Sequence, residues 1–247
     1  MTMLDYDREA DGYDRTRGGE ERADAAAAAI EWLLRPSRAD VVLDVACGTG
    51  IVTARLRHPA RTVVGVDRSP GMLAKAAPRL RGRALLGDAA ALPVAAGRAD
   101  AVVMIWLLHL LPDAAPAIAE AARVLGPAGV LITTVDKNDG PFAAPSDVAE
   151  VTAGPRGAYA DRRADGHDRV VALAARHGLR KAAETTFAGA GQGRSPRQWR
   201  ERIRTGVVPW APAGDTVGAD LDRALAALPD QDERRPDPIY RIIALAR

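Results

Sequence analysis

Short apolar runs alternate with amphipathic segments along most of the chain. Five of the runs are rich in β-branched residues and lack polar alternation, as expected for strands that are covered on both faces. We predict these strands at residues 41–46, 62–67, 83–88, 100–106 and 129–136, and two weaker ones at 181–187 and 239–246. Apolar residues at helical spacing predict helices at 22–34, 50–56, 69–80, 114–125 and 167–178. Strands that alternate with helices in this way indicate an α/β fold, a parallel sheet with crossover helices.

The connection between the last two predicted strands is too long for a hairpin. It contains two further helical patterns, at 195–203 and 215–229, and we interpret it as a helical cap inserted between these strands. The chain is then a single domain with four parts. These parts are an N-terminal helical lid (1–36), a core (37–187), the inserted cap (188–238) and a final strand (239–247).

Composition and charge are those of an ordinary globular protein. Of the 247 residues, 47% are hydrophobic and 27% are charged, and the net charge of +2 is too small to indicate a nucleic-acid or membrane partner. The acidic start lacks the parts of a secretory signal and no apolar run reaches the length of a membrane span, so we expect a cytoplasmic protein. Cys47 is the single cysteine, which excludes an internal disulfide and a cysteine-based zinc cluster, and we expect no metal.

The first predicted strand runs into a glycine loop, "LDVACGTG", at residues 43–50. No lysine follows the glycines, which excludes a Walker P-loop and its nucleoside triphosphates. Gly48 and Gly50 fit a dinucleotide pattern better, although Thr53 stands where a third small residue belongs. Asp44 would repel a pyrophosphate but attract the sulfonium and ammonium groups of S-adenosylmethionine, whose carboxylate the loop N–H groups would hold. The loop therefore favours S-adenosylmethionine over NAD.

Two further acids follow at the ends of the next two strands. Asp67 ends the second strand, a position from which a carboxylate accepts both hydrogen bonds of a ribose diol. A dinucleotide and S-adenosylmethionine share this requirement. Asp88 ends the third strand, where its side chain can accept from an adenine amino group while the Ala89 N–H serves a ring nitrogen. Dinucleotide folds do not usually require an acid there, so the second acid again favours S-adenosylmethionine.

Five motifs in order along the chain resemble those of the class I S-adenosylmethionine-dependent methyltransferases. They are "LDVACGTG", "VVGVDRSPGML", "GDAAALPV", "DAVVMIWLLHLLPD" and "AARVLGPAGVLITT", and they cover about residues 41–136. The resemblance implies a doubly wound, Rossmann-like sheet of seven mostly parallel strands, the last of them antiparallel. The cofactor-binding residues that it implies are Asp44, Gly48, Gly50, Asp67, Met72 and Asp88, with Met72 on the adenine face.

The N-terminal segment "YDREADGYDRTRG" is similar to the small-molecule branch of that family. In that branch the matching tyrosine and arginine positions help to close over the methionine end of the cofactor. The resemblance assigns this role to Tyr13 and Arg17 in the present chain.

Loops after the fourth, fifth and sixth strands are expected to face the methyl acceptor, because ligands of open α/β sheets lie at the carboxyl ends of the strands. His109, in "LLHLLPD", takes the first position of the family's "HHLPD" pattern and is our candidate general base, with His167 and Asp136 as alternatives. Methyl transfer from a sulfonium also proceeds by alignment without a base. Asp136 and His167, with Trp199 and Trp210, are candidate acceptor-binding residues, although the tryptophans fit the core of the cap equally well.

The leading hypothesis is a methyltransferase that acts on an oxygen, nitrogen or activated carbon of a small molecule, such as a natural product or another aromatic metabolite. A cap of the predicted size would obstruct a protein or folded RNA, and no sequence feature indicates a nucleic-acid partner. Two alternatives stay open. One is a regulatory or scaffold protein that binds the cofactor without transferring its methyl group, and the other is a dinucleotide-dependent oxidoreductase.

Overall fold

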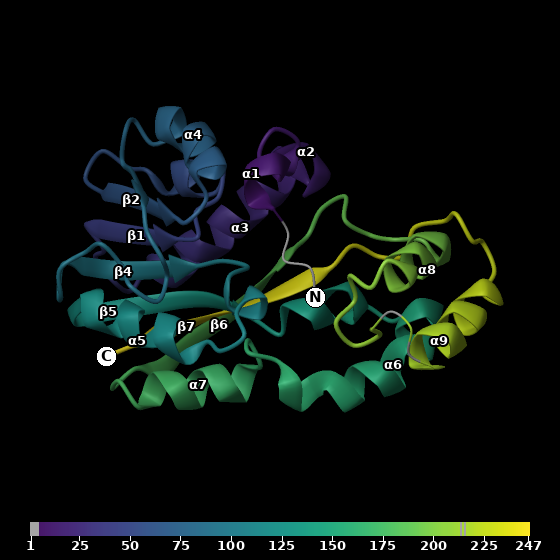
Figure 1. The fold of residues 1–247 in the computed structure, drawn as a ribbon. Coiled ribbons are helices and arrows are strands. Elements are labelled where there is room, and N and C mark those ends of the chain that lie inside the picture. Colours follow the sequence, from purple (N-terminus) through teal and green to yellow (C-terminus); the bar gives the residue numbers. More distant parts are fainter. Residues whose placement is uncertain (1–4, 213, 215) are drawn as a thin grey trace.

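The computed structural model describes residues 5–212, 214 and 216–247. Within these residues seven strands form one sheet in the order β3-β2-β1-β4-β5-β7-β6 (Figure 1). All seven strands predicted from sequence are present, and their bounds are β1 Val41–Val45, β2 Thr62–Asp67, β3 Ala84–Leu86, β4 Ala99–Met104, β5 Leu125–Val135, β6 Arg180–Ala188 and β7 Ile239–Ala246. β7 is antiparallel to both of its neighbours, β5 and β6, whereas β1 to β5 pair in parallel. The predicted fold class is confirmed.

Nine α-helices surround the sheet in the described part of the chain. Four of the five helices predicted between the strands are present, and the helices are α1 Tyr6–Glu9, α2 Tyr13–Thr16, α3 Gly19–Leu34, α4 Pro70–Arg79, α5 Ala115–Val124, α6 Asp147–Tyr159, α7 His167–Ala175, α8 Pro196–Arg204 and α9 Thr216–Ala226. α4 begins as its sequence predicts, because the Ser69 hydroxyl accepts from the Met72 N–H and Pro70 follows the cap. None of these helices is long and apolar enough to cross a membrane, judged over the same residues.

Two helical segments differ from the prediction. Residues 50–56 form a turn and a short 3₁₀ helix, Thr53–Leu56, because Gly50 has a positive φ of 73° and the backbone is already extended at Arg57. The sequence pattern also missed α6. Gly154, Pro155 and Gly157 lie within this helix and lower its intrinsic helix propensity, so only the packed structure identifies it as helical.

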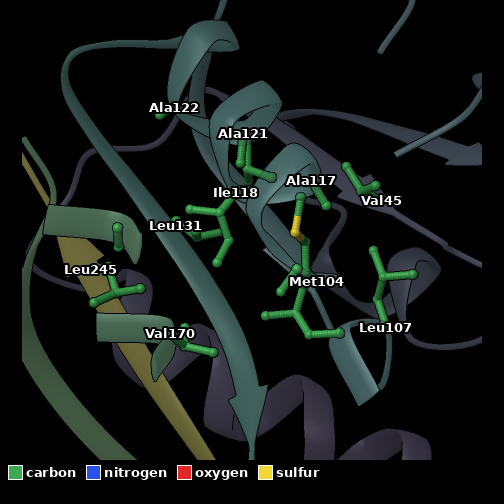
Figure 2. Packing of buried hydrophobic residues seen from close by; sticks show 14 of the residues in the cluster. Val45, Met104, Leu107, Ala117, Ile118, Ala121, Ala122, Leu131, Val170 and Leu245 are labelled. Carbon is green, nitrogen blue, oxygen red and sulfur yellow. The ribbon is translucent and has the colours of Figure 1, made fainter. Parts of the chain in front are cut away.

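The core consists of two apolar layers, one on each face of the sheet. Figure 2 shows the layer between the sheet and α5 and α7, where Ile118 and Val170 pack with Met104, Leu131 and Leu245. The second layer lies under α3 and includes its alanines and leucines. Full burial of each large aliphatic side chain contributes roughly 1.5–3 kcal/mol. These layers fix the strands, and therefore fix the positions of the loops at the strand ends.

A third apolar cluster joins α6, α8 and α9 beyond the carboxyl ends of the strands (Figure 1). Phe142 lies at its centre, with ring centroids 5.0 Å from Trp199 and 5.7 Å from Trp210. Both tryptophans are only 6% exposed. They belong to the core of this α6–α8–α9 bundle, which is one of the two roles that the sequence allows for them. The bundle also includes α6, which lies outside residues 188–238.

Candidate functional site

A cavity of about 400 Å³ lies at the carboxyl ends of β1, β2 and β4. Several connecting loops and the N-terminal helices contribute to its walls. The predicted cofactor residues that line it are Tyr13, Asp44, Gly48, Asp67, Met72, Asp88 and Ala89. This arrangement is the one expected of an open α/β sheet, where the ends of neighbouring parallel strands meet at one edge.

The glycine loop after β1 turns sharply at the floor of the cavity. Gly48 and Gly50 have positive φ angles of 56° and 73°. The Gly50 N–H donates to the Cys47 carbonyl at 2.9 Å, and the Gly48 N–H donates to Asp67 Oδ2 at 2.8 Å. These two N–H groups are therefore engaged within the protein. The α-helix predicted directly after the loop does not form, because a turn and a 3₁₀ helix follow, so no α-helix N-terminus faces the cavity at this loop.

We expect Gly50→Ala to lower the free energy of unfolding by roughly 2–4 kcal/mol. A Cβ at Gly50 would lie 3.1 Å from Ala76 Cβ and 3.2 Å from Ala76 Cα, and the positive φ adds strain. Gly48→Ala is the matched control because it has a similar φ but nothing within 4 Å of the added Cβ. Urea unfolding of both variants measures the difference, and equal losses would contradict the steric argument.

Asp67 connects the loops after β1 and β2. Its Oδ2 accepts from the Gly48 N–H at 2.8 Å, and its Oδ1 accepts from the Ser69 N–H at 2.9 Å. The carboxylate is buried and lines the cavity. Because each carboxylate oxygen accepts about two hydrogen bonds, one position on each oxygen stays available for a diol.

Asp44 places a second buried carboxyl group at the cavity, 4% exposed. Burial raises the pKa of Asp44 from 3.8 to about 7; the Thr53 hydroxyl, which donates to Oδ2, lowers it, and the charge of Asp67 raises it. A carboxylate in such a place is costly unless a cation compensates it. The residues therefore fit a ligand with a positive charge near Asp44, as the sequence predicts.

The remaining predicted cofactor residues occupy the far wall. Met72 is buried below the cavity surface, and Asp88 lies at its exposed rim, where Oδ1 accepts from the Ala90 N–H at 2.7 Å. Ala89 also lines the cavity. An adenine ring placed here would contact a thioether, a carboxylate and a backbone edge.

The N-terminal helices are fastened to the cavity by short polar contacts. Asp7 accepts from the Ser69 hydroxyl at 2.6 Å and from the Gly71 N–H at 2.7 Å. Asp14 accepts from the Thr49 hydroxyl at 2.6 Å. α1 and α2 therefore lie beside the glycine loop and the start of α4, and Tyr6 and Tyr13 line the cavity.

Arg17, predicted to close over the methionine end, is not among the residues that line the cavity. Its guanidinium carbon lies 5.6 Å from the centroid of the Tyr13 ring, which does line it. Arg22 and Trp106, which the sequence did not indicate, contribute to the cavity wall, with Arg22 lying 3.7 Å above the Trp106 ring. Their contact depends on where α3 crosses the end of β4, and no local pattern predicts that crossing.

The candidate acceptor residues outside the cap are also away from this cavity. Asp136 lies 3.3 Å from Arg241 and 3.7 Å from Arg163, and it accepts from the His167 N–H at 3.2 Å. The His167 ring lies 2.7 Å from the carboxylate of Asp168. Both residues thus belong to a network of polar contacts, and their contact with an acceptor stays a prediction.

His109 is half-buried and is not among the residues that line the cavity; its Nδ1 atom is buried and has no partner among the described residues. Burial lowers the pKa of His109 well below 6.5, and the charges of Lys137 and Arg17 lower it further. The imidazole is therefore neutral at neutral pH. Burial also raises the pKa of the Cys47 thiol, which makes this side chain a poor nucleophile. No group of three or more His, Cys, Asp or Glu side chains in the described ranges is arranged to hold a metal.

Comparisons with known proteins agree with this geometry. Residues 43–133 match the model of a family described as methyltransferase domain. The chain is 44% identical over 104 residues to an uncharacterized methyltransferase of Mycobacterium tuberculosis, covering 42% of each chain. It is 40% identical over 99 residues to the demethylmenaquinone methyltransferase of Mycolicibacterium gilvum, covering 40% of this chain and 43% of that protein. The matched region thus spans less than half the length of these curated relatives.

Solved structures show the same fold over more of the chain. A SAM-dependent methyltransferase of Thermotoga maritima superposes with a TM-score of 0.57 at 16% identity and covers 98% of this chain and 97% of its own. The geranyl diphosphate C-methyltransferase of Streptomyces coelicolor has a TM-score of 0.52 at 16% identity, with coverage of 91% and 77%. At such identities the likeness concerns the fold alone. Residues 43–133 thus match a methyltransferase domain in sequence, and the chain has the fold of methyltransferase structures.

Proposed function

We propose that the protein transfers a methyl group from S-adenosylmethionine to a small molecule. The observation that carries this proposal is the pair of buried carboxyl groups, Asp44 and Asp67, at one cavity beside the glycine loop. Asp67 has free acceptor positions for the two hydroxyl groups of a ribose. Burial disfavours the ionised form of Asp44, so a bound cation near this carboxyl group would stabilise its negative charge. A cationic nucleoside satisfies both.

A dinucleotide fits the same cavity less well. The N–H groups of Gly48 and Gly50 are engaged with Asp67 and Cys47, so they offer no cradle to a pyrophosphate. The charge on Asp44 would oppose the phosphates as well. These contacts favour the sulfonium cofactor over NAD.

In this proposal each residue has a limited task. Asp44 attracts the positive end of the cofactor, Asp67 orients the ribose, and Met72, Asp88 and Ala89 hold the adenine. The bound cofactor supplies an electrophilic methyl group with a good leaving group. The protein then contributes alignment and exclusion of water, with α1 and α2 acting as the lid and the α6–α8–α9 bundle as the cap.

The acceptor is proposed to be small because the N-terminal helices and the bundle lie on either side of the strand ends (Figure 1). The demethylmenaquinone and geranyl diphosphate methyltransferases, by their names, act on small molecules. His109 stays the candidate base for a hydroxyl acceptor, since it is neutral and its Nδ1 is free of protein partners in the described structure. A base of such low pKa would contribute modestly, and alignment would supply most of the rate.

Incubation with methyl-labelled S-adenosylmethionine and a pooled metabolite library tests the function directly. We expect one or a few compounds to gain a methyl group, identified by mass spectrometry. The Asp67→Ala protein, prepared in the same way, is the control for methyl transfer by contaminating enzymes. Saturable binding of the cofactor without transfer to any compound would instead support a regulatory or scaffold role.

A further inference from the structure

Four cationic side chains from distant parts of the chain lie close enough to interact electrostatically. The Arg17 carbonyl accepts from Gln192 Nε2 at 3.3 Å, and Arg194 lies 5.4 Å from the centroid of the Trp199 ring, so both residues lie at the segment that precedes α8. Arg17 follows α2, Lys137 follows β5, Arg194 precedes α8 and Arg202 lies within α8. We name this group the cationic cluster. α2 and α8 both lie on the side of the sheet where the parallel strands end, opposite the C-terminus (Figure 1). Burial first, and then the charges of Arg194, Arg202 and Arg17, lower the pKa of Lys137 to about 7.

The cluster is poorly compensated by acids in the part of the chain that the structure describes. The Glu9 carboxylate lies 3.5 Å from the half-exposed guanidinium group of Arg17. Among the described residues, no ion pair joins a carboxylate to the side chains of Lys137, Arg194 or Arg202. The Nε atoms of Arg17 and Arg202 are buried without a hydrogen-bond partner. The four side chains are half-buried, and withdrawing like charges from water without partners is unfavourable, so a bound anion would stabilise this region.

The other titratable groups that face the cluster add little negative charge. Asp165 faces Lys137, but its Oδ2 already accepts from the Lys137 backbone N–H at 2.8 Å, and burial raises its pKa. Tyr240 donates its hydroxyl to Gln192 Oε1 at 2.7 Å, and burial raises its pKa. His109 is neutral, and Arg22 and Arg234 are further cations.

The cluster borders the cavity without lining it. Arg17 lies over Tyr13, and Tyr240 packs on Trp106 with ring centroids 5.7 Å apart; Tyr13 and Trp106 both line the cavity. An anion held by the cluster would therefore lie beyond the space proposed for the cofactor, on the side of the α6–α8–α9 bundle. The acceptor is the molecule expected there.

We propose that the cationic cluster binds an anionic group, a carboxylate or a phosphate, of the methyl acceptor. The inference rests on the proposed function, because it takes the cavity itself as the cofactor site. Guanidinium groups bind carboxylate and phosphate oxygens in a bidentate manner, and such bonds are among the strongest in proteins. An anchor of this kind fixes one end of the acceptor and leaves the rest of the molecule to reach the cavity.

The test compares Arg202→Gln with Arg204→Gln. Both residues lie on α8, but Arg204 is exposed and pairs with Asp222 at 2.9 Å, so it is the matched control. Inorganic pyrophosphate and succinate are the probes, titrated at constant ionic strength while the melting temperature is followed. Binding of S-adenosylhomocysteine is measured on the same proteins by calorimetry. Arg194→Gln serves as the second variant if Arg202→Gln does not fold.

We expect saturable stabilisation of the native protein by at least one probe, and the better probe identifies the phosphate or carboxylate class. Arg202→Gln should weaken that affinity by roughly 10-fold to 100-fold, and Arg204→Gln by less than about 2-fold. S-adenosylhomocysteine affinity should stay within about 2-fold in both variants. Absence of saturable anion binding, or equal losses in both variants, would overturn the proposal.

Two other results have distinct meanings. If Arg202→Gln weakens S-adenosylhomocysteine as much as the anion, the cluster belongs to the cofactor and the acceptor assignment is wrong. If the native protein binds the anion but not S-adenosylhomocysteine, the proposed function is wrong. The anion could then no longer be assigned to a methyl acceptor.

Proton uptake gives an independent measurement. A bound anion stabilises protonated Lys137, so binding near pH 7.5 should take up a fraction of a proton. Calorimetric titrations in buffers of different ionisation enthalpy detect this uptake. The difference in uptake between the native protein and Lys137→Met isolates the contribution of Lys137 from that of the probe, and an unchanged uptake in this variant would contradict the role of Lys137.

Discussion

Asp67→Ala is expected to weaken the binding of S-adenosylhomocysteine by roughly 100-fold or more, because two charge-assisted hydrogen bonds to the ribose are lost. The carboxylate also holds the Gly48 and Ser69 N–H groups, so the loop after β1 loses its support as well. Isothermal titration calorimetry measures the affinity. The protein is expected to remain folded because the two apolar layers of the sheet are untouched.

Asp100→Ala is the matched control for this experiment. Asp100 Oδ2 accepts from the backbone N–H groups of Val41 at 2.8 Å and Asp40 at 3.1 Å, at the opposite end of the parallel strands. The control therefore removes a carboxylate that also binds two N–H groups, but far from the cavity. If Asp100→Ala loses as much affinity as Asp67→Ala, the ribose role of Asp67 is wrong.

Asp44→Asn is expected to raise stability at pH 8 while it weakens cofactor binding. The pKa of Asp44 is raised from 3.8 to about 7, so between these pH values the native protein holds a proton that the unfolded chain has released. The free energy of unfolding therefore falls as pH rises through this window. Asparagine removes the cost of the buried charge, and we expect a gain on the order of 1–3 kcal/mol at pH 8.

The pH dependence separates this effect from a general change in packing. At pH 4 Asp44 is protonated in the native state, so Asp44→Asn should then have nearly the same stability as the native protein. Melting temperatures of both proteins at pH 4 and pH 8 test this: the difference between them should be large only at pH 8. Cofactor affinity in the native protein should rise from pH 6 to pH 8, since a cationic ligand favours the ionised carboxylate. The same rise in Asp44→Asn would show that another group is responsible.

The sequence predicted β1, β2, β4 and β5 well because these strands are largely buried and read as continuous apolar runs. The edge strands β3 and β6 are more exposed. The sequence predicted Asp44, Asp67 and Asp88 for a related reason: a residue at the carboxyl end of a parallel strand lies at one edge of the sheet. The structure places all three at the cavity.

Other features depend on contacts between distant segments. Trp199 and Trp210 fit both an acceptor platform and a core, and only the packing around Phe142 distinguishes the two. Asp136 is engaged by Arg241, 105 residues away in the chain. The cationic cluster likewise joins residues near both ends of the chain, and no periodicity indicates that they meet.

The bundle is attached to the sheet in a way that has consequences for redesign. α8 and α9 leave the sheet after β6 and return at β7, while α6 follows β5. Asp44, Asp67 and Asp88 lie within residues 43–133, and all four members of the cationic cluster lie outside that segment. Replacing α8 and α9 with other helices between β6 and β7 is therefore expected to change the surface proposed for the acceptor while residues 43–133, with the proposed cofactor residues, stay unchanged.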